Sequence, residues 1–250
     1  MAPLDALAFD HRAETATPAA EAALLNARHG DLSAPEIIAR AIDRFGEKIA
    51  LVSSFGAESA VLLHIAASVD RSVPVVFVDT GRLFPETLAY RDTLIEALGL
   101  TDVRTVGPDP AKLANADPYK ALWMTDADAC CRIRKTEPLS RALEGFDAWF
   151  TGRKRFQAAT RAAIPVFEAD GVRIKVNPLA AWNSAELKAY AAEKGLPAHP
   201  LVAQGYPSIG CVPCTSKVKE GEDERAGRWR GLDKTECGIH FGLEIDGSGI

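Results

Sequence analysis

The sequence feature that most constrains the fold is a regular alternation of short apolar runs with helical stretches. Residues 48–53 (KIALVS) and 74–79 (PVVFVD) predict buried strands, since each is a brief apolar run bounded by turn residues, and residues 58–68 between them have helical spacing. The alternation continues with helices at 85–98, 130–143 and 184–194 and with strands at 102–106, 148–151 and 172–176. This order predicts an α/β protein with a doubly wound, mostly parallel sheet.

Two further segments flank the alternating region. Residues 19–28 and 33–45 are Ala-rich with helical spacing, and Ser33 precedes Pro35 as a helix cap. The stretch 204–219 concentrates Gly, Pro and Ser without a clear period, so we expect a loop there and a mobile end beyond it. We therefore predict three parts: N-terminal helices over 1–45, an α/β domain over 46–205 and a cysteine-containing C-terminal tail over 206–250.

Composition and charge narrow the class of protein. With 250 residues, 47% of them hydrophobic and 25% charged, the chain is long enough for a large core and unlike a disordered protein. The net charge of -5 disfavours nucleic-acid binding, and no apolar run approaches the roughly 18 residues that cross a bilayer. Residues 1–18 lack the basic start and apolar core of a signal peptide. We expect a cytoplasmic protein with no nucleic-acid or membrane partner.

Five cysteines, all in the second half of the chain, carry the clearest chemical signal. An odd number cannot close entirely into intramolecular disulfides, and cytoplasmic thiols are normally reduced. The adjacent pair Cys130 and Cys131 and the spaced pair Cys211 and Cys214 can surround a zinc ion or an iron–sulfur cluster. An adjacent pair reaches one small ion only with strain but can bind neighbouring irons of a cubane, which favours [4Fe–4S]. A redox-active Cys211–Cys214 pair and buried, unliganded thiols are the alternatives.

Polar and basic residues follow three of the predicted strands, at the edge where open α/β sheets bind ligands. Residues 53–59 (SSFGAES) lead into a helix whose first N–H groups suit a phosphate or sulfate. Residues 79–82 (DTGR) place an acid and a cation after the second strand. Residues 153–155 (RKR), with Arg161 further along, give a basic segment suited to an anionic substrate. Ordinary helix-capping turns and a solvated basic face are the structural alternatives.

Two residues near the cysteine motifs invite a chemical interpretation. Lys135 lies four residues after Cys131, so on a helix it shares the cysteine face and can offset the negative charge of a thiolate-bound cluster. Cys237 is followed by Gly238 and then by His240, a setting compatible with a nucleophile whose thiolate is favoured by nearby cations. The corresponding alternatives are a helical salt-bridge lysine and a free surface cysteine.

Taken together, these motifs resemble one family, the assimilatory sulfonucleotide reductases, and within it the iron–sulfur branch that acts on adenosine 5'-phosphosulfate (APS). The motifs stand in the family's order and leave only the N-terminal helices uncovered: residues 53–59 (SSFGAES), 79–82 (DTGR), 130–135 (CCRIRK), 211–214 (CVPC) and 234–240 (KTECGIH). Chance agreement of five such motifs is remote.

The resemblance implies a PP-loop-like adenine nucleotide alpha hydrolase fold. Residues 53–59 resemble a modified form of the loop that ATP pyrophosphatases use, typically S-G-G-x-D-S, with Phe55 and Glu58 at the distinguishing places. This difference argues against ATP cleavage and for a sulfonucleotide. Members of the family commonly have an Arg-Arg-x-Gln-Ser run where this chain has residues 154–158 (KRFQA), so the hydroxyl is missing while the basic character is kept.

The resemblance also implies roles for particular residues. Cys130, Cys131, Cys211 and Cys214 ligate the [4Fe–4S] cluster, and Cys237 is the catalytic nucleophile. Lys135 links the cluster to the substrate electrostatically, and the tail residues Arg225, Arg228 and His240 enclose the phosphate and sulfate. The full set implied in substrate binding is Ser53, Ser54, Phe55, Gly56, Glu58, Ser59, Asp79, Thr80, Gly81, Arg82, Lys135, Arg153, Arg155, Arg225, Arg228 and His240.

The implied reaction is the reduction of APS to sulfite and AMP through an S-sulfonate on Cys237, with reduced thioredoxin or glutaredoxin as partner and a homo-oligomer possible. The same chemistry on 3'-phosphoadenosine 5'-phosphosulfate (PAPS), alone or with APS, is the nearest alternative. That branch typically lacks the two cysteine pairs, which favours APS. An ATP-dependent PP-loop enzyme with structural zinc and a non-catalytic zinc module are the more distant alternatives.

Overall fold

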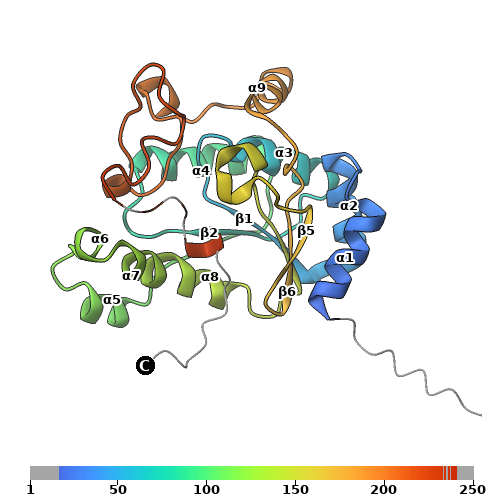
Figure 1. Ribbon diagram of the computed structural model, residues 1–250, viewed down its shortest axis with the longest axis horizontal. Coiled ribbons are helices and arrows are strands. Elements are labelled where there is room, and N and C mark those ends of the chain that lie inside the picture. Colours follow the sequence, from blue (N-terminus) through green and yellow to red (C-terminus); the bar gives the residue numbers. More distant parts are fainter. Residues whose placement is uncertain (1–16, 233, 235, 237, 241–250) are drawn as a thin grey trace, which may run out of the picture.

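The computed structural model describes residues 17–232, 234, 236 and 238–240. Figure 1 shows a central sheet with helices on both faces. Over the described residues the sheet has six strands in the order β3-β2-β1-β4-β6-β5, all parallel except β5, which runs antiparallel to β6. The strands are β1 (Ile49–Ser53), β2 (Val75–Val78), β3 (Val103–Val106), β4 (Ala148–Phe150), β5 (Phe167–Asp170) and β6 (Arg173–Val176).

The helices of the described chain cover both faces of this sheet. They are α1 (Pro18–His29), α2 (Ala34–Phe45), α3 (Ser59–Val69), α4 (Pro85–Leu98), α5 (Pro110–Ala116), α6 (Leu122–Thr125), α7 (Ala127–Cys131), α8 (Glu137–Ala142) and α9 (Ser184–Glu193). None of those in the described part of the chain combines the length and apolar character that a membrane crossing requires.

The strand order creates a switch point between β1 and β4. From β1 the chain proceeds outward to β2 and β3, then returns to place β4 on the other side of β1, with Leu51 opposite both Val75 and Phe150. Adjacent loops at such a point diverge and leave a crevice beyond the carboxyl ends of the strands. The prediction of a doubly wound, mostly parallel α/β fold is confirmed.

Two apolar layers hold the sheet between its helices. Leu51, Phe77 and Phe150 belong to the larger cluster, which includes residues of α2, α3 and α4. Ala50 and Trp149 point to the opposite face, where they pack with residues of the α8 region. Strands buried on both faces need continuous apolar runs, which is why β1 and β2 were recognisable in the sequence.

The helix α1 covers the β5 edge of the sheet. The Asn26 side chain donates to the Phe167 carbonyl (2.6 Å) and accepts from the Phe167 N–H (3.0 Å), so it satisfies backbone groups that would otherwise be exposed at an edge strand. The next helix, α2, begins with a capping box, in which Glu36 accepts from the backbone N–H of Ser33 at 2.9 Å. The cap predicted at Ser33 is confirmed.

The edge strand β5 is absent from the sequence prediction. Its residues, FEAD, include two acidic residues and an alanine, which have low β propensity, so the local pattern does not indicate a strand. Gly171, with φ of +61°, turns the chain directly into β6, which begins at Arg173 rather than at residue 172. The antiparallel hairpin therefore depends on long-range contacts of its carboxylates.

The helix predicted over residues 130–143 is divided into three parts. The cysteine pair Cys130 and Cys131 ends α7 instead of beginning a helix, a π-helical turn spans Arg132–Thr136, and α8 follows. Pro138 lies in the first turn of α8, and its ring cannot tolerate a regular α-helical turn before it. The widened turn accommodates this proline.

The described part of the tail packs onto the ligand end of the sheet, as the brown segment in Figure 1 shows. The backbones of Cys211 and Leu83 form an isolated antiparallel β-bridge, and those of Thr215 and Arg228 form another. Trp229 is buried, and Gly227 lies where a Cβ would come within 2.2 Å of the Ser216 carbonyl oxygen. Residues 204–219 form a loop of short turns, as expected, while the mobility expected of the tail stays a prediction.

Candidate active site

A cavity of about 240 Å³ lies beyond the carboxyl ends of β1 and β4. Its wall combines the loop after β1, the loop after β4, the π-helical turn and parts of the tail. Ten of the residues predicted to bind substrate line this cavity: Ser53, Ser54, Gly56, Glu58, Ser59, Thr80, Lys135, Arg153, Arg225 and Arg228.

Other predicted residues lie outside the wall. These are Phe55, Asp79, Gly81, Arg82 and Arg155. Two further predictions, Cys237 and the side chain of His240, fall outside the described residues. The structure therefore brings together the strand-end loops and the tail, but not every residue of each motif.

Phe55 shapes the loop after β1 from behind. Its φ is +47°, a left-handed conformation that is costly for a bulky residue, and its fully buried ring packs edge-on against Phe77 with centroids 5.3 Å apart. The Ser53 hydroxyl accepts from the Phe55 N–H at 3.1 Å and helps to fix this turn. As a result Gly56 and Ser59 line the cavity at the start of α3, where the positive end of the helix dipole suits an anion.

The cavity is electropositive. Of its lining side chains in the described chain, six are basic and two, Glu58 and Glu236, are acidic. Lys154 is buried and lies 2.5 Å from Glu58. Burial lowers the pKa of Lys154, and the Glu58 carboxylate opposes that effect.

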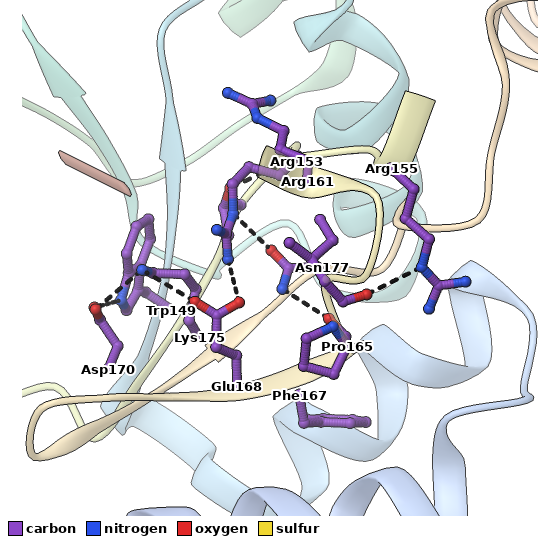
Figure 2. A network of polar contacts seen from close by, with 12 residues as sticks. Trp149, Arg153, Arg155, Arg161, Pro165, Phe167, Glu168, Asp170, Lys175 and Asn177 are labelled. Atoms are coloured by element: carbon purple, nitrogen blue, oxygen red, sulfur yellow. Dashed lines mark hydrogen bonds and ion pairs between the residues drawn. The ribbon is translucent and has the colours of Figure 1, made fainter. Parts of the chain in front are cut away.

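The other two basic side chains of residues 153–155 also form hydrogen bonds within the protein. Figure 2 shows the Arg153 guanidinium directed at Glu168, 2.6 Å away, and at Asn177, 3.2 Å away. Arg155 is exposed, and its Nε donates to the Ile164 carbonyl at 3.0 Å. The segment thus contributes to the wall of the site mainly through groups that already have internal partners.

Arg225 and Arg228 bring the tail into the cavity wall. The Arg228 guanidinium lies 4.4 Å from the centroid of the Trp229 ring and donates to the Ile209 carbonyl at 3.1 Å. Gly210 leaves room for it, since a Cβ there would approach Arg228 Nη2 to 2.3 Å. Burial lowers the pKa of Arg225, and nearby Arg161 adds to the effect.

The strand-end segment after β2 holds the second cysteine pair. The Thr80 hydroxyl lies 3.3 Å from Cys211 Sγ, and the Val212 N–H donates to the Arg82 carbonyl at 2.8 Å. The Arg82 side chain turns away from the cavity toward Asp117, 3.7 Å away. Residues 79–82 therefore support the cysteine loop, and only Thr80 of this motif lines the cavity.

The two cysteine pairs are close enough to interact electrostatically. Burial raises the pKa of Cys130, Arg134 opposes this, and Cys211 and Cys214 add to the rise. The Arg134 guanidinium donates to the Thr80 carbonyl at 2.9 Å and to Asp117 at 2.8 Å, while its buried Nε has no hydrogen-bond partner in the described structure.

The described residues contain no set of three or more His, Cys, Asp or Glu side chains already arranged as metal ligands. The chemistry of the region nevertheless fits a sulfur-ligated group. Four cysteine side chains lie there, three of them buried, beside a cation with an unsatisfied donor. Thiolates are the usual ligands of iron–sulfur clusters, and a buried cation offsets their charge.

Several lining residues are absent from the set that the family resemblance implies in substrate binding. They include Leu83, Thr87, Trp149, Gln157, Arg161, Trp229, Glu236 and Ile239. Arg161 follows the RKR segment and was noted there as a nearby cation, so its residue type was the available signal. Glu236 and Ile239 flank Cys237 in sequence, but nothing local to them indicated that they reach the cavity.

The fold and site define an α/β protein with a cavity at the switch point of its sheet, lined mainly by basic rather than acidic charged side chains and close to four cysteines. The sequence matches the model of the phosphoadenosine phosphosulfate reductase domain over residues 48–217. The chain belongs to this family. The matched region includes the sheet, the loops after β1 and β4 and both cysteine pairs.

Individual relatives agree with the family assignment. Adenosine 5'-phosphosulfate reductase of Mesorhizobium japonicum is 56% identical over 229 residues, or 91% of this chain and 90% of that protein. Phosphoadenosine 5'-phosphosulfate reductase of Gloeobacter violaceus is 43% identical over 215 residues, covering 84% and 89%. The crystal structure of phosphoadenylyl-sulfate reductase from Candida auris, in a phosphate complex, has a TM-score of 0.67 at 29% identity and covers 79% of this chain and 96% of that one.

Proposed function

We propose that this protein reduces APS to sulfite and AMP. The observation that carries the proposal is the similarity to proteins named adenosine 5'-phosphosulfate reductase, which extends over about nine-tenths of both chains at 56% identity. The cavity supports it, because an electropositive wall and a helix N-terminus suit a phosphosulfate.

In this proposal the anionic end of APS faces the cations of the wall. The loop after β1 and the first turn of α3 bind the phosphate through N–H and hydroxyl groups of Ser53 to Ser59. Lys135, Arg225 and Arg228 surround the sulfate, where they stabilise negative charge on the transferring group and on the leaving phosphate. His240, from the tail, is assigned to the same group.

The first chemical step is a transfer to Cys237. Its thiolate attacks the sulfur of APS, the bond between that sulfur and the bridging phosphate oxygen breaks, and AMP leaves with the electron pair. The product is a cysteine S-sulfonate on the enzyme. Covalent catalysis of this kind divides the reduction into two steps.

The second step uses a dithiol of reduced thioredoxin or glutaredoxin in the cytoplasm. One thiolate of the dithiol attacks Cys237 Sγ, which forms a mixed disulfide and releases sulfite with the electron pair of the broken S–S bond. The second thiol then attacks the mixed disulfide and regenerates Cys237. The two electrons of the reduction come from the dithiol, which ends as a disulfide.

Cys130, Cys131, Cys211 and Cys214 are assigned as the residues that would hold a [4Fe–4S] cluster. The thiol set and the unsatisfied Nε of Arg134 support this assignment. When bound, the cluster would supply a fixed charge that orders Lys135 beside the substrate. Lys135 lies on the π-helical turn directly after Cys130 and Cys131, and it lines the cavity.

Reduction of PAPS is the second candidate function. It is favoured by the 43% identity to the Gloeobacter violaceus protein of that name and by the family model. The two cysteine pairs favour APS over PAPS.

A comparison of three substrates, each supplied separately, tests the proposed function. Protein purified without oxygen is given reduced thioredoxin and APS, PAPS or ATP in turn, and sulfite or pyrophosphate is measured. We expect sulfite from APS at a far higher kcat/KM than from PAPS, no pyrophosphate from ATP, and about four irons with acid-labile sulfide per chain. Preferred use of PAPS would establish the second candidate, and pyrophosphate release with one zinc per chain would contradict both.

A further inference from the structure

The tail residue Glu236 is bound by an arginine of the cavity wall. Glu236 is 3% exposed, and its two oxygens accept from Arg161 Nε at 2.7 Å and Arg161 Nη2 at 2.6 Å. Arg225 lies 3.7 Å from the same carboxylate. A two-point contact of this kind fixes both the distance and the orientation of the carboxylate.

Arg161 also links Glu236 to the loop after β1. Its Nη1 donates to the Gln157 side chain at 2.5 Å, and Gln157 in turn donates to Glu58 at 2.8 Å. Glu58 immediately precedes α3 in the loop after β1. The tail is therefore joined to the substrate-facing loop by an unbroken series of polar contacts, with Lys154 as the second partner of Glu58.

A second ion pair holds the tail on the other side of the cavity. Lys234 pairs with Asp128 of α7, the helix that ends in Cys130 and Cys131. After Cys237 in sequence, Ile239 lines the cavity and packs against the apolar cluster around Trp149. Described residues before and after Cys237 are thus fixed to different parts of the site.

The chemistry of the pair favours docking over substrate binding as the role of Arg161. The side chains of Arg161 and Glu236 are 8% and 3% exposed, and Nε and both Nη nitrogens of Arg161 donate to the protein itself. Breaking a buried pair leaves an uncompensated charge, so the paired arrangement is strongly preferred. Glu222 in the same tail differs, since its pair with Arg230 is partly exposed.

We propose that Glu236 is a positioning residue, whose pair with Arg161 docks the tail so that the adjacent Cys237 is presented to the substrate. The inference rests on the proposed function in one respect, namely that Cys237 is the nucleophile. A misplacement of about 1 Å in a reacting group can cost 100-fold in rate.

The test compares Glu236→Gln with the matched control Glu222→Gln, which makes the same change in the same tail. S-sulfonate formation from APS is followed in a single turnover without reductant, together with AMP affinity and alkylation of Cys237 by iodoacetamide. We expect Glu236→Gln to slow S-sulfonate formation roughly 10- to 100-fold, with a less than about threefold change in AMP affinity and faster alkylation. Glu222→Gln should stay within about twofold of wild type.

A second variant guards against a folding defect. Glu236→Asp keeps the charge opposite Arg161 but is one methylene shorter. We therefore expect a rate of S-sulfonate formation between those of wild type and Glu236→Gln, in protein with the melting temperature of wild type. If Cys237→Ser forms no S-sulfonate and both Glu236 variants behave like Glu222→Gln, the positioning role is wrong while the proposed reaction stands. If Cys237→Ser still forms S-sulfonate, the nucleophile assignment is wrong instead.

Discussion

His199 shows how one buried residue ties the cavity wall to the pH of the medium. Its side chain is almost fully buried, with Nε2 3.1 Å from the Thr87 hydroxyl and Nδ1 accepting from the Leu201 N–H at 3.2 Å. This arrangement requires the neutral ring. Burial lowers the pKa of His199 to about 4, although Glu86 acts in the opposite direction.

Stability should therefore fall on acidification. The unfolded chain takes up a proton on this histidine near pH 6.5 and the folded chain only near pH 4, so stability is full above 6.5 and is lost as the pH falls from 6.5 to 4. Because of this residue, we expect the free energy of unfolding measured in urea to fall by about 2 kcal/mol between pH 7 and pH 5. His199→Gln should remove that part of the slope, whereas His29→Gln, at a partly exposed position, should keep it. Equal slopes in both variants would show that His199 is not the source of this loss of stability.

Residue types in the motifs were readable from the sequence, but their partners were not. The three cations of residues 153–155 were predicted as a group that faces a ligand. Arg153 and Lys154 line the cavity, and the structure adds that Arg153 pairs with Glu168, 15 residues away, and Lys154 with Glu58, 96 residues away. Such long-range partners leave no local pattern, and so Arg161 and Glu236, 75 residues apart, were not connected either.

At the level of elements, the β5–β6 hairpin places charges inside the protein. Figure 2 shows Lys175 of β6 between Asp170, 3.0 Å away, and Glu168, 3.6 Å away, with its ammonium 4.9 Å from the centroid of the Trp149 ring. The Trp149 N–H also donates to Asp170 at 3.0 Å. Since Glu168 also holds Arg153, this hairpin supports the loop after β4.

Removing the buried ammonium should be costly. Lys175→Met leaves Asp170 without its charged partner, and we expect a loss of about 3 to 5 kcal/mol in the free energy of unfolding measured in urea. Lys188→Met makes the same change in the exposed pair with Glu224 and should cost less than about 1 kcal/mol. Similar losses in the two variants would show that the hairpin does not depend on its charges.

Elements with an apolar period were predictable, and elements held by polar contacts were not. The helix α2 carries an apolar stripe, and the strands β1, β2 and β4 are short apolar runs, as the sequence predicted. The strand β5 and the π-helical turn lack such a signal. The strand β5 is defined by the partners of its carboxylates. The π-helical turn is defined by Pro138 and by contacts such as that of Arg134 with Thr80.

For the whole molecule, the distribution of charge matters more than its sum. The net charge is -5, yet basic side chains outnumber acidic ones in the described wall of the cavity by six to two. Basic side chains are thus concentrated in the wall of this cavity, in a chain that is acidic as a whole. The sequence predicted this concentration, and the structure adds that part of it is used to hold the tail.

In the proposed reaction, Cys237 receives the sulfonate of APS. The most direct measurement is mass spectrometry of protein incubated with APS in the absence of any dithiol, followed by peptide mapping. We expect the added mass of one SO3 group on Cys237 in wild type, its loss as sulfite when reduced thioredoxin is supplied, and no adduct in Cys237→Ser. An adduct on another residue, or sulfite formation by Cys237→Ser at the wild-type rate, would contradict it.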